Sequence, residues 1–364
     1  MKILLLEFSP AEGHKRLFLN TCELLAQQSK LFVVAADGYT LPENMSTIYR
    51  VNNKTVRSKN RYIQVLNKII DSIGRMRLAV KLDYQENFDA IICVTYNEWA
   101  YYIGHFLLGD EQKKIFLMQH NNIDNAERSR IKKWMMQKYA PKVRHIVQCQ
   151  YVADYLAREY KIPEVHIIQW LHPMNANDTT LTPKEEAIDC VGISNSNDEN
   201  VIRELIRKEK SKRIFAKNQI KVLLRSREEE YDDGYLKVIK GYLSKEKYDS
   251  YICAAKCIFL PFPESFVYRM SGTIVDAFSN RKPIIGTNIL LIRQCEKAYP
   301  NICRPFSPDT FCTEIAELTV GSPKQEEDFA QFCRLHEEEH LKSIMARQLE
   351  ASMKEEKFKI ETDF

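Results

Sequence analysis

The stretch CIFLPFPESFVYRMSGTIVDAFSNRKPIIGTN, residues 257–288, decides the fold class of this chain. It opens with the apolar run 257–260, which has the length and composition of a strand buried on both faces. After a loop, Ser-Gly-Thr at 271–273 has the residue types that begin a helix. A second apolar run at 283–286 follows that helix. Strand, helix and strand in this order predict a parallel βαβ unit.

Apolar runs of strand length alternate with helical spans along the rest of the chain. They lie at residues 2–8, 31–36, 89–95, 114–119, 145–149, 165–169, 187–193 and 220–224. After the first run we expect a turn-forming loop at 9–14, which contains Gly13 and His14, and a helix from about residue 17. This alternation predicts an α/β protein whose parallel sheets are covered by helices on both faces. Asn, Asp, Thr and Pro at 173–183 interrupt the alternation and have the composition of a linker.

We therefore predict two tandem Rossmann-like, doubly wound domains, at residues 1–175 and 184–325. The residues after them, 326–364, are rich in Glu, Lys and Gln, and we expect a helical tail that returns toward the N-terminal domain. Ligands of doubly wound sheets bind outside the carboxyl ends of the strands. We therefore expect a ligand in a cleft between the two domains, held by the loops that follow strands.

Composition places the chain among folded globular proteins. Hydrophobic residues make up 45% and charged residues 28%, which excludes disorder, collagen and coiled coil as structures of the whole chain. No apolar run approaches the ~18 residues of a membrane-spanning helix, and the apolar start at 3–6 is too short for a signal peptide. Ten cysteines without framework spacing fit reduced thiols, so we expect a cytoplasmic protein.

Charge is distributed unevenly. The net charge of +4 is too small to indicate nucleic-acid binding, but residues 50–81 carry nine Lys or Arg against the single Asp71. Seven more basic residues and no acidic one lie in 128–144. Four apolar residues of that stretch share one face of a helix: Ile131, Trp134, Met135 and Tyr139. This pattern predicts peripheral contact with an anionic membrane surface, and the alternative is that the face packs on the protein's own sheet.

Motifs of several other protein classes do not occur. The sequence contains no GxGxxG, GxxxxGK[ST] or GxSxG, so dinucleotide-binding, P-loop and hydrolase-elbow functions lose their main support. His336-Glu-Glu-Glu-His340 matches a zinc-protease pattern, but its acidic flanks do not predict the dry, shaped site that the metal needs. We therefore expect no metal site.

The helix start at 271–273 has the chemistry of a phosphate site. Backbone N–H groups at a small Ser-Gly-Thr start can point at an anion, and the helix dipole favours negative charge there. Arg269 just before it can add a bidentate contact, and Asp276 one turn inside can accept hydrogen bonds from a ribose. A structural role fits as well, with Ser271 as the N-cap and Asp276 favourable to the dipole.

These residues resemble the donor-binding region of the GT-B glycosyltransferases, in particular the family 4-like retaining enzymes. Asp276 stands where that family has its ribose-binding Glu, and Ala277 and Pro283 follow at the family's spacing. The stretch 241–248 is similar to the family's segment along the nucleobase. The chain departs from the family at Tyr268, where the first Glu of a carboxylate pair would stand.

The resemblance implies a glycosyltransferase of polysaccharide biosynthesis. Such an enzyme moves a sugar from a nucleoside-diphosphate sugar to a glycan or polyprenyl-linked acceptor, with retention and without a metal or other cofactor. It would act in the cytoplasm, as a peripheral protein at the inner face of the plasma membrane. Donor-binding residues would be Gly13, Ser194, Asn195, Arg225, Tyr242, Leu243, Tyr268, Ser271, Gly272, Thr273 and Asp276. Catalytic residues would be His120, Glu264 and Arg269, and acceptor-binding residues His14 and Asn121.

Two alternatives stay open. A sugar-nucleotide-binding GT-B protein without catalysis, working as the partner of another enzyme, is favoured by Tyr268 in place of the family's Glu. A GT-B epimerase acting on UDP-GlcNAc would need a carboxylate pair and a histidine in the cleft, which this sequence supplies less clearly.

Overall fold

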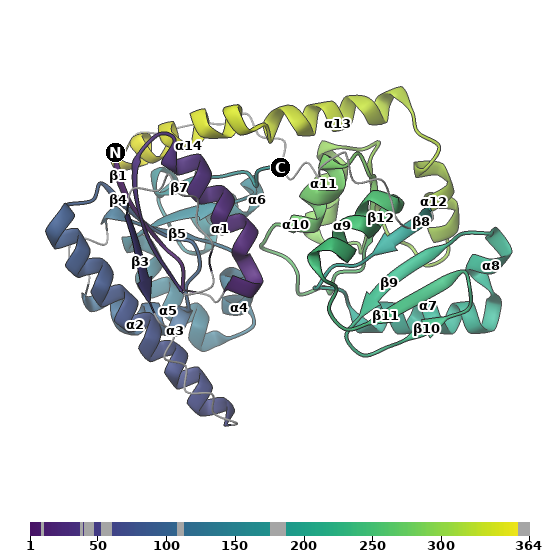
Figure 1. The fold of residues 1–364 in the computed structure, drawn as a ribbon, viewed down its shortest axis with the longest axis horizontal. Coiled ribbons are helices and arrows are strands. Elements are labelled where there is room, and N and C mark those ends of the chain that lie inside the picture. The colour runs from purple at the N-terminus through teal and green to yellow at the C-terminus, as the bar shows by residue number, and fades with distance from the viewer. Residues whose placement is uncertain are drawn as a thin grey trace. The chain divides into compact units, whose positions relative to one another are not determined.

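The computed structural model describes residues 1–8, 11–36, 39, 47–51, 60–107, 113–174 and 187–355. The chain divides into two compact units (Figure 1). Unit 1 comprises Met1–Pro173 together with Glu338–Thr362, and unit 2 comprises Met174–Glu337. Unit 1 is therefore built from both ends of the sequence.

Unit 1 contains a parallel sheet in the order β3-β2-β1-β4-β5-β6-β7. Its strands are β1 (Lys2–Leu6), β2 (Lys30–Ala36), β3 (Thr47–Val51), β4 (Ala90–Cys93), β5 (Ile115–Met118), β6 (Arg144–Val147) and β7 (Ile167–Gln169). The helices are α1 (Ala11–Ala26), α2 (Arg61–Glu86), α3 (Glu98–Gly104), η1 (His105–Leu107), α4 (Asn122–Glu127), α5 (Arg130–Tyr139), η3 (Ala140–Lys142), α6 (Gln150–Glu159), η4 (Glu164–His166) and α14 (Glu338–Met353). Burial of strands on both faces explains why β1, β4 and β5 read as unbroken apolar runs.

Helix α14 completes one face of this sheet. It lies beside α1 (Figure 1), and Met345 and Leu349 join the apolar core that covers the strands on that face. The guanidinium of Arg144 on β6 donates to the carbonyl oxygen of Ser352, with Nη2 at 3.0 Å. The C-terminal helix is thus an integral part of unit 1.

Unit 2 repeats the architecture with the order β10-β11-β9-β8-β12-β13-β14, in which β10 is antiparallel to β11. Its strands are β8 (Ile188–Gly192), β9 (Val222–Ser226), β10 (Tyr231–Asp232), β11 (Leu236–Lys240), β12 (Ala255–Leu260), β13 (Ile284–Gly286) and β14 (Cys303–Pro305). Its helices are α7 (Glu199–Lys212), α8 (Ile214–Asn218), α9 (Lys245–Ala254), α10 (Gly272–Ser279), α11 (Leu290–Ala298), α12 (Phe311–Leu318) and α13 (Pro323–Leu335). The predicted pair of doubly wound sheets is confirmed.

The predicted tail at 326–364 is not one unit of structure. Helix α13 begins at Pro323, packs against α10 and belongs to unit 2, whereas α14 belongs to unit 1. His336 and His340 lie on opposite sides of this division, with His336 capping α13 and His340 inside α14. The zinc-protease pattern therefore does not fall on a single helix.

All ten cysteines lie in the described residues, and none forms a disulfide. Most are buried, and burial raises the pKa of Cys93 and Cys149 to about 12. These thiols behave as small apolar core residues. None of the described helices is long and apolar enough to cross a membrane.

Candidate functional site

The sheet of unit 2 changes its direction of growth beside β8. From β8 the chain adds β9 and β11 on one side, and it then places β12 on the other side. The loops after β8 and β12 therefore separate at their carboxyl ends, where doubly wound sheets bind ligands. Gly192 is the last residue of β8. The position leaves little room for a side chain, because a Cβ there would lie 2.8 Å from a Leu224 methyl carbon and 3.2 Å from the Phe259 carbonyl oxygen.

A buried arginine occupies this edge. Arg225, near the end of β9, is 1% exposed, and its Nε donates to the Gly241 carbonyl oxygen at 2.6 Å. Its Nη1 donates to the Ser194 carbonyl oxygen at 3.4 Å, while Nη2 is buried with no hydrogen-bond partner among the residues that the structure describes. Within the described part of the chain no carboxylate forms an ion pair with it, and burial holds its pKa below the ordinary value for arginine. The structure thus buries a cation that no carboxylate of the described residues neutralises through an ion pair.

Neighbouring residues hold the arginine in place. Asn197 is buried and donates from Nδ2 to the carbonyl oxygens of Gly192 and Arg225, at 2.8 and 2.9 Å. The ring of Tyr242 lies 4.7 Å from the Arg225 guanidinium, and Tyr242 is 82% exposed. The ring of Tyr242 therefore covers the Arg225 cation. The Tyr242 side chain itself remains accessible to solvent.

The carboxylate of Glu199 stabilises the loop after β9. Burial disfavours the charged form of Glu199, but hydrogen bonds from Ser226 and Arg227 outweigh that effect and lower its pKa. The Arg227 backbone N–H donates to Glu199 at 2.9 Å. Glu199 is thus paired with Arg227 and forms no ion pair with Arg225.

Helix α10 begins on the same edge, after the loop that follows β12. Its N-cap is Ser271, whose hydroxyl accepts from the Thr273 N–H at 3.2 Å, so the structural interpretation of this serine is confirmed. Asp276 is mostly buried and accepts from the Tyr248 hydroxyl at 2.9 Å. The Arg269 guanidinium lies 3.9 Å from the centre of the Phe266 ring.

The other predicted donor residues differ in their exposure. Ser194 and Thr273 are buried, and Leu243 and Tyr268 are half-buried. Asn195 and Gly272 are exposed, as is Glu264, which was predicted to be catalytic. Apart from Gly13, the predicted donor residues all lie in unit 2, on its β8, β9, β11 and β12 loops and at the start of α10.

A different set of polar side chains lies at the carboxyl edge of unit 1. Glu7 follows β1 and is fully buried, and it accepts a hydrogen bond from the hydroxyl of Thr95, which follows β4. Strands β1 and β4 are adjacent at the point where this sheet also changes direction. Glu7 was not among the predicted site residues, because residues 2–8 read as one continuous strand, whereas β1 ends at Leu6 and Glu7 follows it.

His120 lies on the same edge, after β5. Its Nε2 is 2.7 Å from the Val94 carbonyl oxygen, so this nitrogen carries the hydrogen, and Nδ1 is an acceptor in the neutral ring. The imidazole is thus oriented by unit 1 itself. Asn121, the predicted acceptor residue beside it, is exposed at the start of α4.

The predicted residues Gly13 and His14 lie in a helix and not in a loop. Helix α1 begins at Ala11, whereas the sequence predicted a loop through Gly13 and His14 and a helix from about 17. The prediction was wrong because Ala, Glu and Leu are strong helix formers that outweigh one glycine in the first turn. The side chains at 11–16 lie outside the described part of the structure.

The predicted membrane-facing helix was also partly wrong. Met135 and Tyr139 of α5 are fully buried, and only Ile131 and Trp134 of the predicted face are exposed. The face turns inward because α5 must cover the sheet of unit 1 and pack against α3.

A buried network of polar side chains connects residues that follow β4 and β5 with His145 on β6. Gln119 accepts from the Tyr96 hydroxyl at 3.1 Å and donates to Nδ1 of His145 at 2.9 Å. Nε2 of His145 donates to the Ala140 carbonyl oxygen at 3.0 Å. Both ring nitrogens are used by the neutral tautomer, and burial lowers the pKa of His145 to about 4.

We expect the stability of unit 1 to fall as the pH drops from about 6.5 toward 4. In this range the unfolded chain takes up a proton on His145 that the folded protein does not bind, which costs about 1.4 kcal/mol per pH unit. Urea unfolding at pH 7 and pH 5 measures the effect, and His145→Gln should reduce the difference. An equal loss of stability in the variant would assign the pH dependence to other groups.

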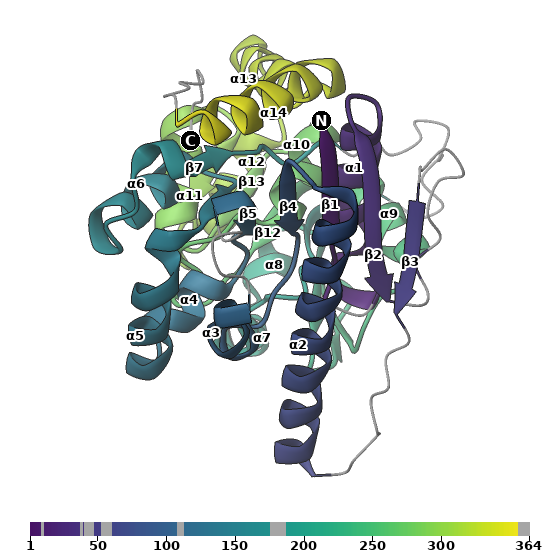
Figure 2. The same cartoon turned by 90° about the vertical axis from the view of Figure 1, so that its left-hand side faces the viewer.

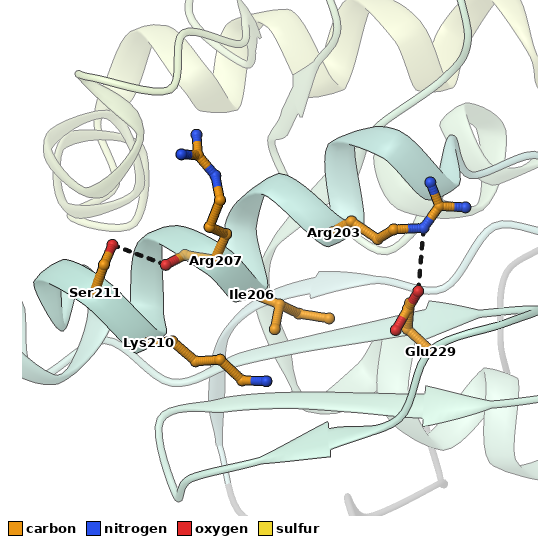
Figure 3. A pocket seen from close by; sticks show the side chains of 6 residues that line it. All are labelled: Arg203, Ile206, Arg207, Lys210, Ser211 and Glu229. Atoms are coloured by element: carbon orange, nitrogen blue, oxygen red, sulfur yellow. Dashed lines mark hydrogen bonds and ion pairs between the residues drawn. The ribbon is translucent and has the colours of Figure 1, made fainter.

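An open hollow of about 490 Å³ lies along α7 in unit 2 (Figure 3). It is lined by Arg203, Ile206, Arg207, Lys210, Ser211 and Glu229. Arg203 is paired with Glu228 and Glu229, and Lys210 lies 5.2 Å from the Tyr231 ring. None of the predicted site residues lines this hollow, so it is distinct from the carboxyl edge of the sheet.

Comparison with known proteins bears on the fold. No family model and no curated protein matches the sequence. Among solved structures, HepE of Anabaena in complex with UDP and glucose matches with a TM-score of 0.65 at 11% identity, over 96% of this chain and 100% of that one. A UDP-forming trehalose-phosphate synthase of Burkholderia vietnamiensis matches with a TM-score of 0.66 at 8% identity, over 96% and 100%.

A UDP-N-acetylglucosamine 2-epimerase of Rickettsia bellii is also similar, with a TM-score of 0.56 at 13% identity over 97% of each chain. Each likeness covers 96% or more of this chain and therefore extends over both units. The chain therefore has the fold of the GT-B glycosyltransferases.

Proposed function

We propose that the protein is a glycosyltransferase that binds a nucleoside-diphosphate sugar at the carboxyl edge of unit 2. The observation that carries this proposal is Arg225, a buried guanidinium with an unpartnered Nη2. A buried charge is costly unless an opposite charge meets it, and the start of α10 on the same edge offers backbone N–H groups to an anion. A diphosphate fits both features.

The reaction follows from this placement. The bond between the anomeric carbon and the diphosphate oxygen breaks and leaves its electron pair on that oxygen. An acceptor hydroxyl oxygen bonds to the carbon and gives up its proton to an oxygen of the leaving diphosphate. Negative charge accumulates on the leaving diphosphate, where Arg225, Arg269 and the α10 dipole stabilise it. We propose that no metal is needed, and that the sugar is transferred with retention, as the family resemblance implies.

Other residues complete the proposed assignment. Asp276 would accept hydrogen bonds from the ribose, and the exposed ring of Tyr242 would stack on the base. His120 and Glu264 would act near the reacting carbon. The acceptor would be a glycan or a polyprenyl-linked sugar in polysaccharide biosynthesis, and the protein would work in the cytoplasm at the inner face of the plasma membrane, with no role for nucleic acid.

Isothermal titration with a panel of UDP- and GDP-sugars tests the proposal. We expect one of them to bind, and we expect its affinity to survive addition of EDTA. Binding of none of these donors would contradict the assignment of a nucleotide-sugar site.

Asp276→Asn is expected to weaken donor binding by about 1 kcal/mol, because a neutral amide replaces a charged acceptor. The fold should persist, since the amide oxygen can still accept from the Tyr248 hydroxyl. Asp309→Asn is the matched control, because Asp309 is exposed at the surface of the same unit. Equal affinities in the two variants would remove Asp276 from the ribose site.

A non-catalytic nucleotide-sugar-binding protein is the second candidate. It is favoured by Tyr268, which stands where the resembling family has a carboxylate. Incubation of the pure protein with its donor distinguishes the two, because transfer or slow hydrolysis releases the nucleoside diphosphate. Conversion of UDP-GlcNAc to its 2-epimer, followed by NMR, would instead indicate the epimerase.

A further inference from the structure

The N-terminal half of α2 exposes an apolar stripe. Its large apolar side chains are open to solvent: Tyr62, Ile63, Val65, Leu66 and Ile70. Leu66 is 55% and Ile70 57% exposed. Because each residue turns the helix by about 100°, Tyr62, Leu66 and Ile70 lie on neighbouring positions of one face.

This stripe precedes the part of α2 that packs on its own unit. The buried residues of the helix are Ser72, Arg75, Met76, Ala79, Leu82 and Asp83. All of them lie beyond residue 71, so the first turns of the helix bury no side chain among those described. Figure 2 shows this end of α2 extending past α3 and α5. The exposed stripe therefore has no partner within the described part of unit 1.

Two neighbouring helical segments of unit 1 expose further large apolar side chains. Gly104 of α3 packs tightly against α2, since a Cβ there would lie 2.7 Å from Met76 Sδ and 3.8 Å from Ile73 Cγ1. Beside this contact, Ile103 is 50% and Phe106 73% exposed. Trp134 of α5 is also exposed, and its ring lies 5.4 Å from that of Tyr102 on α3. We call this area the α2–α5 surface, consisting of Tyr62, Ile63, Val65, Leu66, Ile70, Ile103, Phe106, Ile131 and Trp134.

The charges around the α2–α5 surface are mainly positive. Four exposed cations flank it: Arg77 and Lys81 on α2, and Arg130 and Lys138 on α5. Nearby carboxylates on α2, α3 and α4 are engaged in ion pairs, because Asp83 pairs with Lys114, Glu98 with Lys132, and Glu127 with Lys133. Asp71 is half-buried. An exposed apolar area with a cationic border fits an anionic partner that also accepts apolar side chains.

We propose that the α2–α5 surface docks on the anionic headgroups of a lipid bilayer and inserts its apolar side chains among the upper acyl chains. Each cation near an anionic leaflet adds about 1 kcal/mol of attraction, and Trp and Tyr favour the interface. A second copy of the chain fits less well, because face-to-face contact would bring the cationic borders together. Only the purpose of this docking rests on the proposed function, because the docking would bring unit 1 to a lipid-linked acceptor.

Sedimentation with vesicles tests the docking directly. The full chain is mixed with phosphatidylglycerol–phosphatidylcholine vesicles or with phosphatidylcholine vesicles alone, at low and high salt. We expect binding to the anionic vesicles that weakens with salt. Leu66→Ser/Ile70→Ser should reduce the partition coefficient roughly tenfold or more, because two apolar side chains no longer insert. Arg77→Glu/Lys81→Glu should reduce it at low salt and flatten the salt dependence.

Val320→Ser is the matched control, since Val320 is 82% exposed on unit 2 and should not affect vesicle binding. Donor titration on each variant separates this inference from the proposed function, because the α2–α5 surface lies in unit 1 and the donor residues in unit 2. Absence of vesicle binding, equal binding by the Leu66→Ser/Ile70→Ser variant, or a dimer that the same variant dissociates would each overturn the membrane proposal.

Discussion

Arg225→Met is expected to lower the affinity for the nucleotide donor by about 1.5–3 kcal/mol, the value of a hydrogen bond to a charged group. The methionine retains the apolar stem but removes the guanidinium whose Nη2 has no hydrogen-bond partner among the described residues. Loss of a buried, unpaired charge offsets loss of the bonds to Gly241 and Ser194, so we expect only a small change in the free energy of unfolding.

Titration calorimetry and urea unfolding on the same preparation measure both quantities. Arg225→Lys should recover only part of the affinity, because an ammonium keeps the charge but not the planar fork. Arg207→Met, at an exposed position on α7, is the control for loss of one positive charge from unit 2. Unchanged donor affinity in Arg225→Met would move the phosphate site away from this residue.

Leu349→Ala is expected to cost about 2–5 kcal/mol in the unfolding of unit 1, the range for large-to-small changes in a closed core. Leu349 is fully buried in the core shared by α1, α14 and the sheet, although it lies close to the end of the sequence. Val320→Ala, at an exposed position, should change stability by less than about 0.5 kcal/mol.

Tryptophan fluorescence reports on this effect selectively. The chain's three tryptophans, Trp99, Trp134 and Trp170, all lie in unit 1. We expect Leu349→Ala to move the urea midpoint seen by fluorescence, while the part of the circular dichroism signal that arises from unit 2 stays in place. Equal shifts by both probes would mean that the two units unfold as one.

The sequence predicted the two sheets well because strands buried on both faces read as continuous apolar runs. It also located Arg225, since a charged residue that ends such a run lies at the edge where ligands bind. Glu7 was not predicted, because its hydrogen-bond partner Thr95 is distant in sequence. Only the pairing of β1 with β4 brings the two residues close.

The apolar faces of α5 and α2 differ in whether other parts of the protein cover them. Both helices carry an apolar face beside basic residues, yet Met135 and Tyr139 of α5 are buried, whereas Leu66 and Ile70 of α2 are exposed. Periodicity shows that a helix has an apolar face, but the tertiary packing decides whether anything covers it. The identity of the donor sugar is likewise set by side chains from several loops, which no local pattern reports.

The divided sequence of unit 1 has a consequence for the order in which the protein folds during translation. Domains that are continuous in sequence usually fold as they emerge from the ribosome, with the N-terminal one first. Here the N-terminal unit must wait for α14, and until then the core surface that Met345 and Leu349 cover stays open. Unit 2 needs no later segment and can finish earlier. We therefore expect nascent chains that stop before α14 to be cleaved by proteases in their first half while their second half resists.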